Sequence, residues 1–460
     1  MGFTQLEFLV FLVVLLPLVW ACRRVTARNG LLLVASYYFY AYWDIRFCGL
    51  LLLSTAVDSL AASRIAASDR AVIRRSWLAL SLTVNLGVLG FFKYFNFFID
   101  SLRPILEAAG LRADTLEIIL PVGISFYTFQ TLSYTIDVYR GSIRPARRTL
   151  DFALYVAFFP QLVAGPIVRA RELLPQLGRC PNWSRRRFYG GFQQLLRGAV
   201  KKVLLADRLG EVADVVFAGP QWYSGVTVWI GVLAYTGQIY YDFAGYSDMA
   251  IGCAKMLGYR FPVNFRHPYL ATSPAAFWRR WHMTLSRWLR DYLYISLGGS
   301  RVGRRMTYRN LLITMTLGGL WHGAAWTFVL WGVWHGLALA ITRAAAAGTT
   351  WRPPRPVAWA ATLLVVVVGW VGFRSPDLAT AGTILWSMAT LPGGVHWYPP
   401  LGIATLACLV LDHVAWRTRL RRAMRLPWDA WYSPTLTFVI LWALLLYAPR
   451  GFRPFVYFQF

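Results

Sequence analysis

FWRRWHMTLSRWLRDYLYISLGGS, residues 277–300, and NLLITMTLGGLWHGAAW, residues 310–326, form the most distinctive part of a 460-residue chain. They place His282 and His322 beside tryptophans, arginines and glycines, in a chain whose other long stretches are mostly apolar. An ionisable side chain among apolar membrane segments costs free energy, so such residues generally mark functional sites. The two histidines are therefore the first candidates for chemistry.

The composition outside this stretch is that of a membrane protein. The chain is 57% hydrophobic and 15% charged, with a mean hydropathy of +0.46, whereas soluble domains average about 25% charged residues. Several apolar runs reach the ~17–25 residues that a spanning helix needs. The first run, residues 6–22, is followed by Arg23 and Arg24 and has no basic residue before it, so we interpret it as a retained helix and not a signal peptide. We expect an all-α polytopic membrane protein.

The distribution of basic residues predicts the topology. Most of the 47 Lys and Arg residues fall in loops at alternate crossings, such as residues 140–148 and 417–425, and basic loops face the cytoplasm. This predicts about eleven or twelve crossings, with both termini outside. Without an internal repeat, residues 1–460 are expected to form a single membrane domain. The predicted crossings lie at residues 6–22, 31–43, 50–62, 77–99, 120–139, 185–218, 226–256, 311–340 (two), 357–371, 401–414 and 436–447.

One apolar segment departs from this pattern. Residues 151–168, DFALYVAFFPQLVAGPIV, have basic residues on both sides and contain Pro160, Gly165 and Pro166. Proline interrupts the helical hydrogen-bond ladder. Two interpretations remain open: a broken or re-entrant segment shielded by protein, or an ordinary kinked span, since spanning helices tolerate proline and glycine.

The segment containing His282 is predicted to be one amphipathic helix. Aromatic and apolar residues recur at spacings of three and four, while the arginines point elsewhere, which suits a helix at the membrane interface. His282 lies near the border between the two faces, where it either serves a site or only hydrogen-bonds locally. The apolar face consists of Phe277, Trp281, Leu285, Trp288, Leu289 and Tyr292, and the arginines are Arg279, Arg280, Arg287 and Arg290.

His322 lies in an apolar run among Gly318, Gly319 and Gly323. Small residues let neighbouring backbones approach, and they would leave the imidazole exposed to a narrow channel. Histidine is the usual general base, because its unperturbed pKa of about 6.5 is near working pH. A buried structural histidine is the alternative. His335 repeats the local WHG motif, and at about 100° per residue we expect it far round the helix from His322.

Other classes of site find little support. The net charge of +27 follows from the cytoplasmic loops, and a basic stripe with interleaved aromatics is missing, so we expect no nucleic acid partner. Nucleophile, phosphate-binding and metal-spacing motifs are also missing, and we expect no bound metal or cofactor. The five cysteines are scattered, which predicts neither disulfides nor a zinc site. They are Cys22, Cys48, Cys180, Cys253 and Cys408.

The long motifs resemble a known family. FWRRWHMTLSRWLRDYLYISLGG and LGGLWHGAAWTFVLWGVWHG are similar to the membrane-bound O-acyltransferase superfamily. PVGISFYTFQTLSYTIDVYRG, FPQLVAGPI, YYDFAGYSDMAIG and the terminal FVYFQF resemble its bacterial alginate O-acetyltransferase branch. The resemblance implies a ring of helices around a central channel, with re-entrant and interfacial helices. It also implies that His322 is the catalytic residue in the channel and that His282 is its family partner.

The resemblance further implies the reaction. An acetyl group would pass from a cytoplasmic thioester, acetyl-CoA, toward an exported polysaccharide such as alginate, directly or through a periplasmic acetyltransferase. Arg279, Arg280, Arg287 and Arg290 would attract the phosphates of this donor substrate. The enzyme would lie among the lipids of the bacterial inner membrane, with both termini periplasmic.

Several alternatives stay open at this point. Cellulose, peptidoglycan or teichoic acid are other possible acceptors. A transporter or scaffold without catalysis is a different class, which dense charge pairs inside the spans would favour. The aspartates near span ends lack basic partners within the same run: Asp137, Asp242, Asp248 and Asp412.

Overall fold

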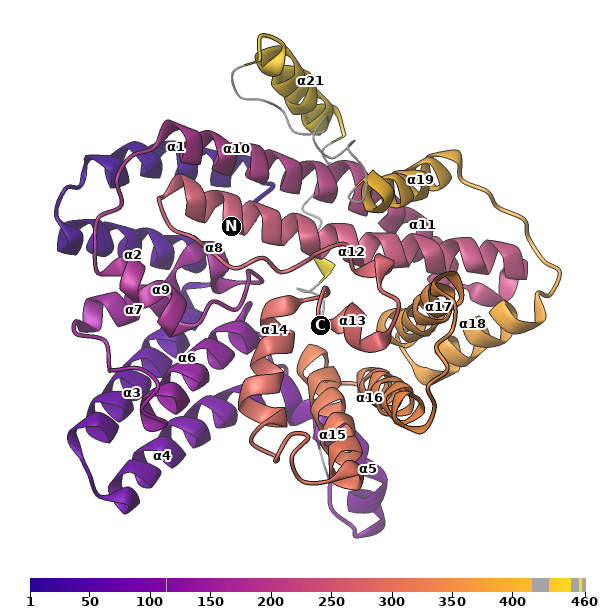
Figure 1. Ribbon diagram of the computed structural model, residues 1–460, viewed down its shortest axis with the longest axis horizontal. Coiled ribbons are helices and arrows are strands. Elements are labelled where there is room, and N and C mark those ends of the chain that lie inside the picture. The colour runs from indigo at the N-terminus through magenta and orange to yellow at the C-terminus, as the bar shows by residue number, and fades with distance from the viewer. Residues whose placement is uncertain (113, 416–429, 448–454, 457–460) are drawn as a thin grey trace. The chain divides into compact units, whose positions relative to one another are not determined.

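The computed structural model describes residues 1–112, 114–415, 430–447 and 455–456. These residues are mostly helical (Figure 1), and β-type pairing among them is limited to one bridge between Tyr223 and Val395. The predicted all-α class is confirmed. The chain divides into two compact units, Met1–Leu195 with Met249–Pro262 and Leu196–Asp248 with Val263–Phe460. That residues 1–460 act as a single domain stays a prediction.

The first unit contains the helices expected from the N-terminal apolar runs. Its centre is held by polar side chains between α3, α4 and α6. The buried Asp58 carboxylate accepts hydrogen bonds from Asn85 Nδ2 at 2.9 Å, from Thr135 Oγ1 at 3.1 Å and from Ser81. Such bonds join helices where the surroundings are apolar. The helices are α1 (Leu6–Ala21), α2 (Val25–Ala41), α3 (Cys48–Ala67), α4 (Ala71–Leu89), α5 (Phe95–Ala108), α6 (Ile124–Tyr139), α7 (Thr149–Ala157), α8 (Phe159–Leu162), α9 (Ala170–Leu177) and the start of α10 (Arg185–Val200).

The proline-containing segment of this unit is broken, as one of the two interpretations predicted. α7 ends at Ala157, α8 covers only Phe159–Leu162, and residues 163–169 are not helical. Residues 154–170 are all buried, which meets the condition that irregular backbone in a membrane protein be shielded by protein. Gly165 is required there, because a Cβ on it would lie 2.5 Å from the Cα of Gln161.

The second unit contains residues 277–300 and 310–326, with both candidate histidines. α18 was not predicted from the sequence, because its apolar run is too short to span a membrane. Its capping signal was visible: the Asp377 side chain accepts a hydrogen bond from Thr380 N–H at 2.7 Å. The helices are α11 (Asp207–Ala218), most of α12 (Gly225–Met256), α13 (Pro274–Trp278), α14 (Met283–Trp288), α15 (Arg304–His322), α16 (Trp326–Gly348), α17 (Arg355–Arg374), α18 (Leu378–Thr390), α19 (Pro400–Ala415) and α21 (Ser433–Leu446).

Within the part of the chain that the structure describes, four helical stretches are long and apolar enough to cross a membrane, and three shorter apolar helices, α1, α19 and α21, accompany them. The protein is therefore a multi-pass membrane protein. The number of eleven or twelve crossings and the outward orientation of the termini stay predictions, and the basic loop at residues 417–425 lies outside the described residues. The four stretches are Ile45–Ala67, Ala71–Ala108, Trp326–Gly348 and Arg355–Arg374.

Candidate active site

His322 is the last residue of α15; the backbone is extended at Gly323 and bends at residues 324–325 before α16 begins at Trp326. His322 and His335 therefore lie on two different helices. The expectation that they occupy distant positions around one helix is wrong, because residues 323–325 interrupt the helix.

The glycines around His322 pack the two helices together. A Cβ on Gly319 would lie 3.0 Å from the Cα of Gly332 on α16, and one on Gly323 would strike the ring of Phe328. Small residues that let helices approach in this way are typical of membrane proteins. The side chain of His322 is only 5% exposed. The glycines thus serve helix packing, and the structure does not support their expected role of opening a channel beside the imidazole.

His282 lies in a turn between α13 and α14, with a left-handed backbone at φ 39°. The single amphipathic helix expected over this segment is wrong: α13 ends at Trp278, α14 starts at Met283, and a π-helical turn follows at Leu289–Tyr294. The six residues of the predicted apolar face are nevertheless all buried. Left-handed backbone costs a non-glycine residue of order 1–2 kcal/mol, and such strain clusters at functional sites.

Asn264 holds the turn at His282, and the sequence analysis did not identify it. Its backbone carbonyl accepts the Met283 N–H at 2.9 Å, and its Oδ1 accepts the N–H and the hydroxyl of Thr284 at 3.2 and 3.0 Å. Its own amide donates to Ser247 Oγ on α12 at 3.2 Å. This fully buried side chain therefore ties the turn at His282 to α12 and so fixes the position of His282. An Asn preceding the FWRRWH motif by less than twenty residues gives no local signal of this role.

The structure brings the two predicted histidines together. Their ring centroids lie 6.2 Å apart, and the side chain of His282 is fully buried. The surrounding wall is aromatic: His282 contacts Phe243 edge-on at 4.6 Å, and His322 contacts Trp331 at 5.2 Å and Phe373 at 5.3 Å. The arrangement, called the pocket from here on, is two buried imidazoles surrounded by aromatic side chains, which suits proton transfer and hydrogen bonding to a substrate shielded from water.

Burial also determines the charge of His282, which lies outside the four candidate spans. Desolvation lowers the pKa of His282 to about 3, because burial disfavours the cationic form of an imidazole. The ring is therefore neutral at physiological pH, and a neutral imidazole donates through one nitrogen and accepts through the other.

The four arginines are all more exposed than the two histidines. Arg279 and Arg290 are exposed, and Arg280 and Arg287 are half-buried. Arg290 pairs with its neighbour Asp291, with Nε and Oδ1 2.6 Å apart. They present positive charge on this segment of the second unit, which is compatible with attraction of an anionic donor, but their donor-binding role stays a prediction.

His335 is closer to this pocket than predicted. It is 1% exposed, and its ring centroid lies 4.9 Å from that of Trp331, whose ring centroid is 5.2 Å from that of His322. Trp331 thus contacts both imidazoles. The His335 ring also stacks on Phe277 and meets Trp278 edge-on, so it is part of the aromatic packing around the site.

Ion pairs between helices were missed by the sequence analysis. Asp242 pairs with Lys202 at 2.6 Å and Asp248 with Lys201 at 2.8 Å, so the expectation that these aspartates lack basic partners holds only within their own run. Lys202 also pairs with Asp207 at 3.0 Å. Two residues of the terminal motif pack here: Val456 N–H donates to Asp242 Oδ2 at 2.9 Å, and the Lys202 ammonium lies over the ring of Phe455.

Known proteins are similar in sequence to this one along most of the chain. The model of the membrane-bound O-acyltransferase family matches residues 148–378. A probable alginate O-acetylase of Azotobacter vinelandii is 48% identical over 81% of this chain and 75% of its own length. That of Pseudomonas putida is 41% identical over 98% and 99%, respectively. A peptidoglycan O-acetyltransferase of Helicobacter pylori is 38% identical over 79% of this chain and 74% of its own length.

Proposed function

Because this chain belongs to the membrane-bound O-acyltransferase family, it is an O-acyltransferase, and we propose that it O-acetylates an exported polysaccharide, with alginate the first candidate. The supporting observation is that two histidines from different elements meet in one buried pocket, with ring centroids 6.2 Å apart. A relative matched over 99% of its length is named a probable alginate O-acetylase, which supports acetyl as the group and alginate as the acceptor.

The proposed reaction uses acetyl-CoA as its donor substrate. His322 accepts the proton of the acceptor hydroxyl as the hydroxyl oxygen attacks the thioester carbonyl. A C–O bond forms, the C–S bond breaks, and the proton passes to the departing thiolate. His282, neutral and held by the Asn264 turn, donates a hydrogen bond to the carbonyl oxygen, where negative charge develops. The aromatic wall excludes water, which would otherwise hydrolyse the thioester.

The direction of transfer follows from where the two substrates are available. Acetyl-CoA is cytoplasmic and the polymer is exported, so we propose that the protein lies in the bacterial inner membrane with both termini periplasmic. The donor's phosphates are attracted by Arg279, Arg280, Arg287 and Arg290, because charge-assisted bonds to phosphate are strong. The acceptor is either the polymer hydroxyl or a periplasmic acetyltransferase partner that completes the transfer.

The acceptor polymer is tested by supplying each candidate separately. The purified protein in lipid vesicles receives acetyl-CoA carrying a labelled acetyl group, together with alginate, cellulose or peptidoglycan fragments, with and without a periplasmic extract. We expect labelled ester on alginate. Dependence on the extract would identify the relay route. Ester on peptidoglycan alone would replace alginate as the acceptor, and no ester on any polymer would contradict the proposed function.

A further inference from the structure

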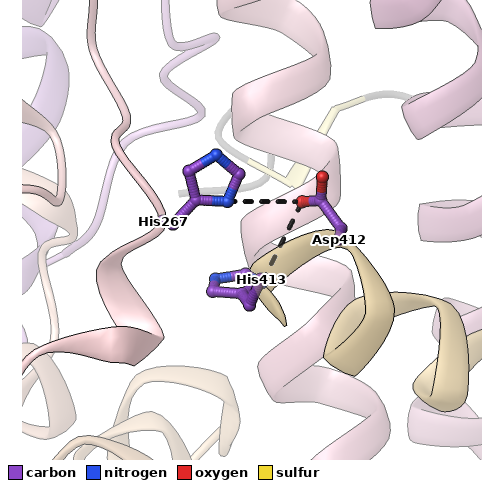
Figure 2. A group of neighbouring side chains, drawn as sticks. All are labelled: His267, Asp412 and His413. Carbon is purple, nitrogen blue, oxygen red and sulfur yellow. Dashed lines mark ion pairs between the residues drawn. The ribbon is translucent and has the colours of Figure 1, made fainter. Parts of the chain in front are cut away.

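A second group of histidines lies in the second unit, with no part in the proposed acetyl transfer. His267 precedes a short turn at Pro268–Leu270, while Asp412 and His413 are adjacent residues near the end of α19. Figure 2 shows the three side chains converging on one another from these two segments. The Nδ1 of His267 lies 3.7 Å from Oδ2 of Asp412. One ligand-type atom from each residue lies within 4.8 Å of the other two.

The hydrogen bonding of His413 fixes which of its nitrogens is offered. Nδ1 lies 2.9 Å from the carbonyl oxygen of Leu409, one turn earlier on α19. A carbonyl only accepts, so Nδ1 carries the proton and donates. Nε2 is then the nitrogen with a lone pair, and it is buried without a hydrogen-bond partner among the residues that the structure describes. Metal-binding histidines characteristically donate their other N–H to a carbonyl in this way.

The neighbours hold these side chains in place. The His413 ring stacks on Tyr269, with centroids 5.5 Å apart, and also contacts the ring of Tyr240 at 5.0 Å. The Tyr240 hydroxyl donates to Asp412 Oδ2 at 3.5 Å. Among the described residues, Lys201 and Arg197 are cations near the cluster, and they pair with Asp248 at 2.8 and 3.2 Å. Those ion pairs offset charges that would otherwise repel a further cation.

We propose that His267, Asp412 and His413 bind one zinc ion. Two imidazoles and one carboxylate form a ligand set that zinc accepts, with metal–ligand distances of about 2.0–2.2 Å and a fourth position left for water. Tetrahedral ligands at those distances are separated by roughly 3.4 Å. One ligand-type atom of each residue already lies within 4.8 Å of the other two. The His413 atom near Asp412 is Nδ1, 3.9 Å from Oδ2, so binding through Nε2 requires the His413 side chain to rotate. The ion would link α19 to the loop that leads into α13.

The sequence alone gives no signal of this site. Zinc motifs are recognised by short spacings between ligands, whereas His267 and the Asp412–His413 pair lie in distant parts of the chain. The predicted absence of a metal site therefore addressed only local patterns. The site does not depend on the proposed acetyl transfer, since neither His282 nor His322 belongs to it.

The test measures zinc bound to the full-length protein in detergent, after removal of any affinity tag and of metal by a chelator. Zinc is titrated against a competing fluorescent chelator, and bound metal is counted by mass spectrometry. We expect one zinc per chain, with affinity falling about tenfold or more in His267→Asn, Asp412→Asn and His413→Gln. His396→Asn is the matched control, because this exposed histidine bonds only to its neighbour Tyr398 among the described contacts and should bind zinc like the unchanged protein.

Two results would overturn the proposal. One is that the protein without substitutions binds less than one zinc per chain at micromolar zinc. The other is stoichiometric binding that persists in Asp412→Asn and in His267→Asn, which would place the ion elsewhere. Asp412→Asn is decisive if His413→Gln fails to fold, because it keeps the size of a side chain that is 28% exposed. Cobalt provides a second measurement: tetrahedral binding gives visible absorption bands, which should disappear in the same variants.

Discussion

Replacing His322 with asparagine is the sharpest test of the pocket. Asparagine keeps hydrogen bonding but does not take up a proton at neutral pH, so this change removes the base while retaining polarity. A general base contributes about 10²–10⁴-fold in rate, which corresponds to about 2.7–5.5 kcal/mol of activation free energy. We therefore expect acetyl transfer to fall to between a hundredth and a ten-thousandth of the normal rate.

The structure explains why asparagine is preferred to alanine. The His322 ring is 5% exposed and contacts Trp321, Trp331 and Phe373. Alanine would leave a cavity among these rings, and truncating a buried side chain of comparable size costs about 2–5 kcal/mol of folding free energy. Lost activity in the alanine variant would then reflect lost protein as well as lost chemistry.

The assay follows labelled acetyl transfer in membranes, normalised to the amount of folded protein measured by size-exclusion chromatography. His396→Asn is the control, since His396 is exposed and bonds to Tyr398, and it should keep normal activity. A His322→Asn protein of normal abundance that retains more than about a tenth of the rate would refute the base assignment. A rate that is low but rises with pH would indicate that another group takes the proton.

Three further changes test the surroundings of the pocket. Asn264→Ala removes the hydrogen-bond acceptor for Thr284. We expect the free energy of unfolding in denaturant to fall by about 1–3 kcal/mol, together with a lower kcat. An unchanged kcat would mean that the turn does not position His282. Gly319→Ala pushes α15 away from Gly332 on α16 and should lower the free energy of unfolding by about 1–3 kcal/mol. Gly348→Ala is the control and should be neutral, because the space around its Cβ is open. Equal melting temperatures of the two variants would contradict this packing. Replacing the four arginines of the donor-binding prediction with glutamine should raise KM for acetyl-CoA more than it lowers kcat. An unchanged KM would leave them no donor-binding role. The four are Arg279, Arg280, Arg287 and Arg290.

The positions of most helices were predictable, because long apolar runs have few alternatives to helix in a membrane. The run at residues 6–22 became α1, and that at 357–371 became the centre of α17. Interruptions inside a periodic pattern were not predictable. The turn at His282 keeps the apolar residues buried on both sides of it, so the pattern of spacings looks continuous although the backbone is not.

The two site histidines were identified from local sequence, but the residues that position them were not. Asn264 acts through hydrogen bonds to Thr284 and to Ser247 on α12, and such pairings depend on how distant segments pack. The same reason accounts for the glycines beside His322. Their spacing correctly indicated close approach of backbones, but only the structure identifies α16 as the neighbour.

The ion pairs between helices bear on the rival class of transporter. By the criterion that charge pairs within the spans favour transport, the pairs Lys202–Asp242 and Lys201–Asp248 count for that class. Their geometry favours a structural role. Lys202 is held by Asp242 and Asp207 at once, and Asp242 also accepts the backbone N–H of Val456. A buried cluster bonded on several sides holds segments in a unique arrangement, and breaking it is costly. It therefore holds Val456 against α12 within the unit that contains both histidines, as an enzyme with a preorganised pocket requires.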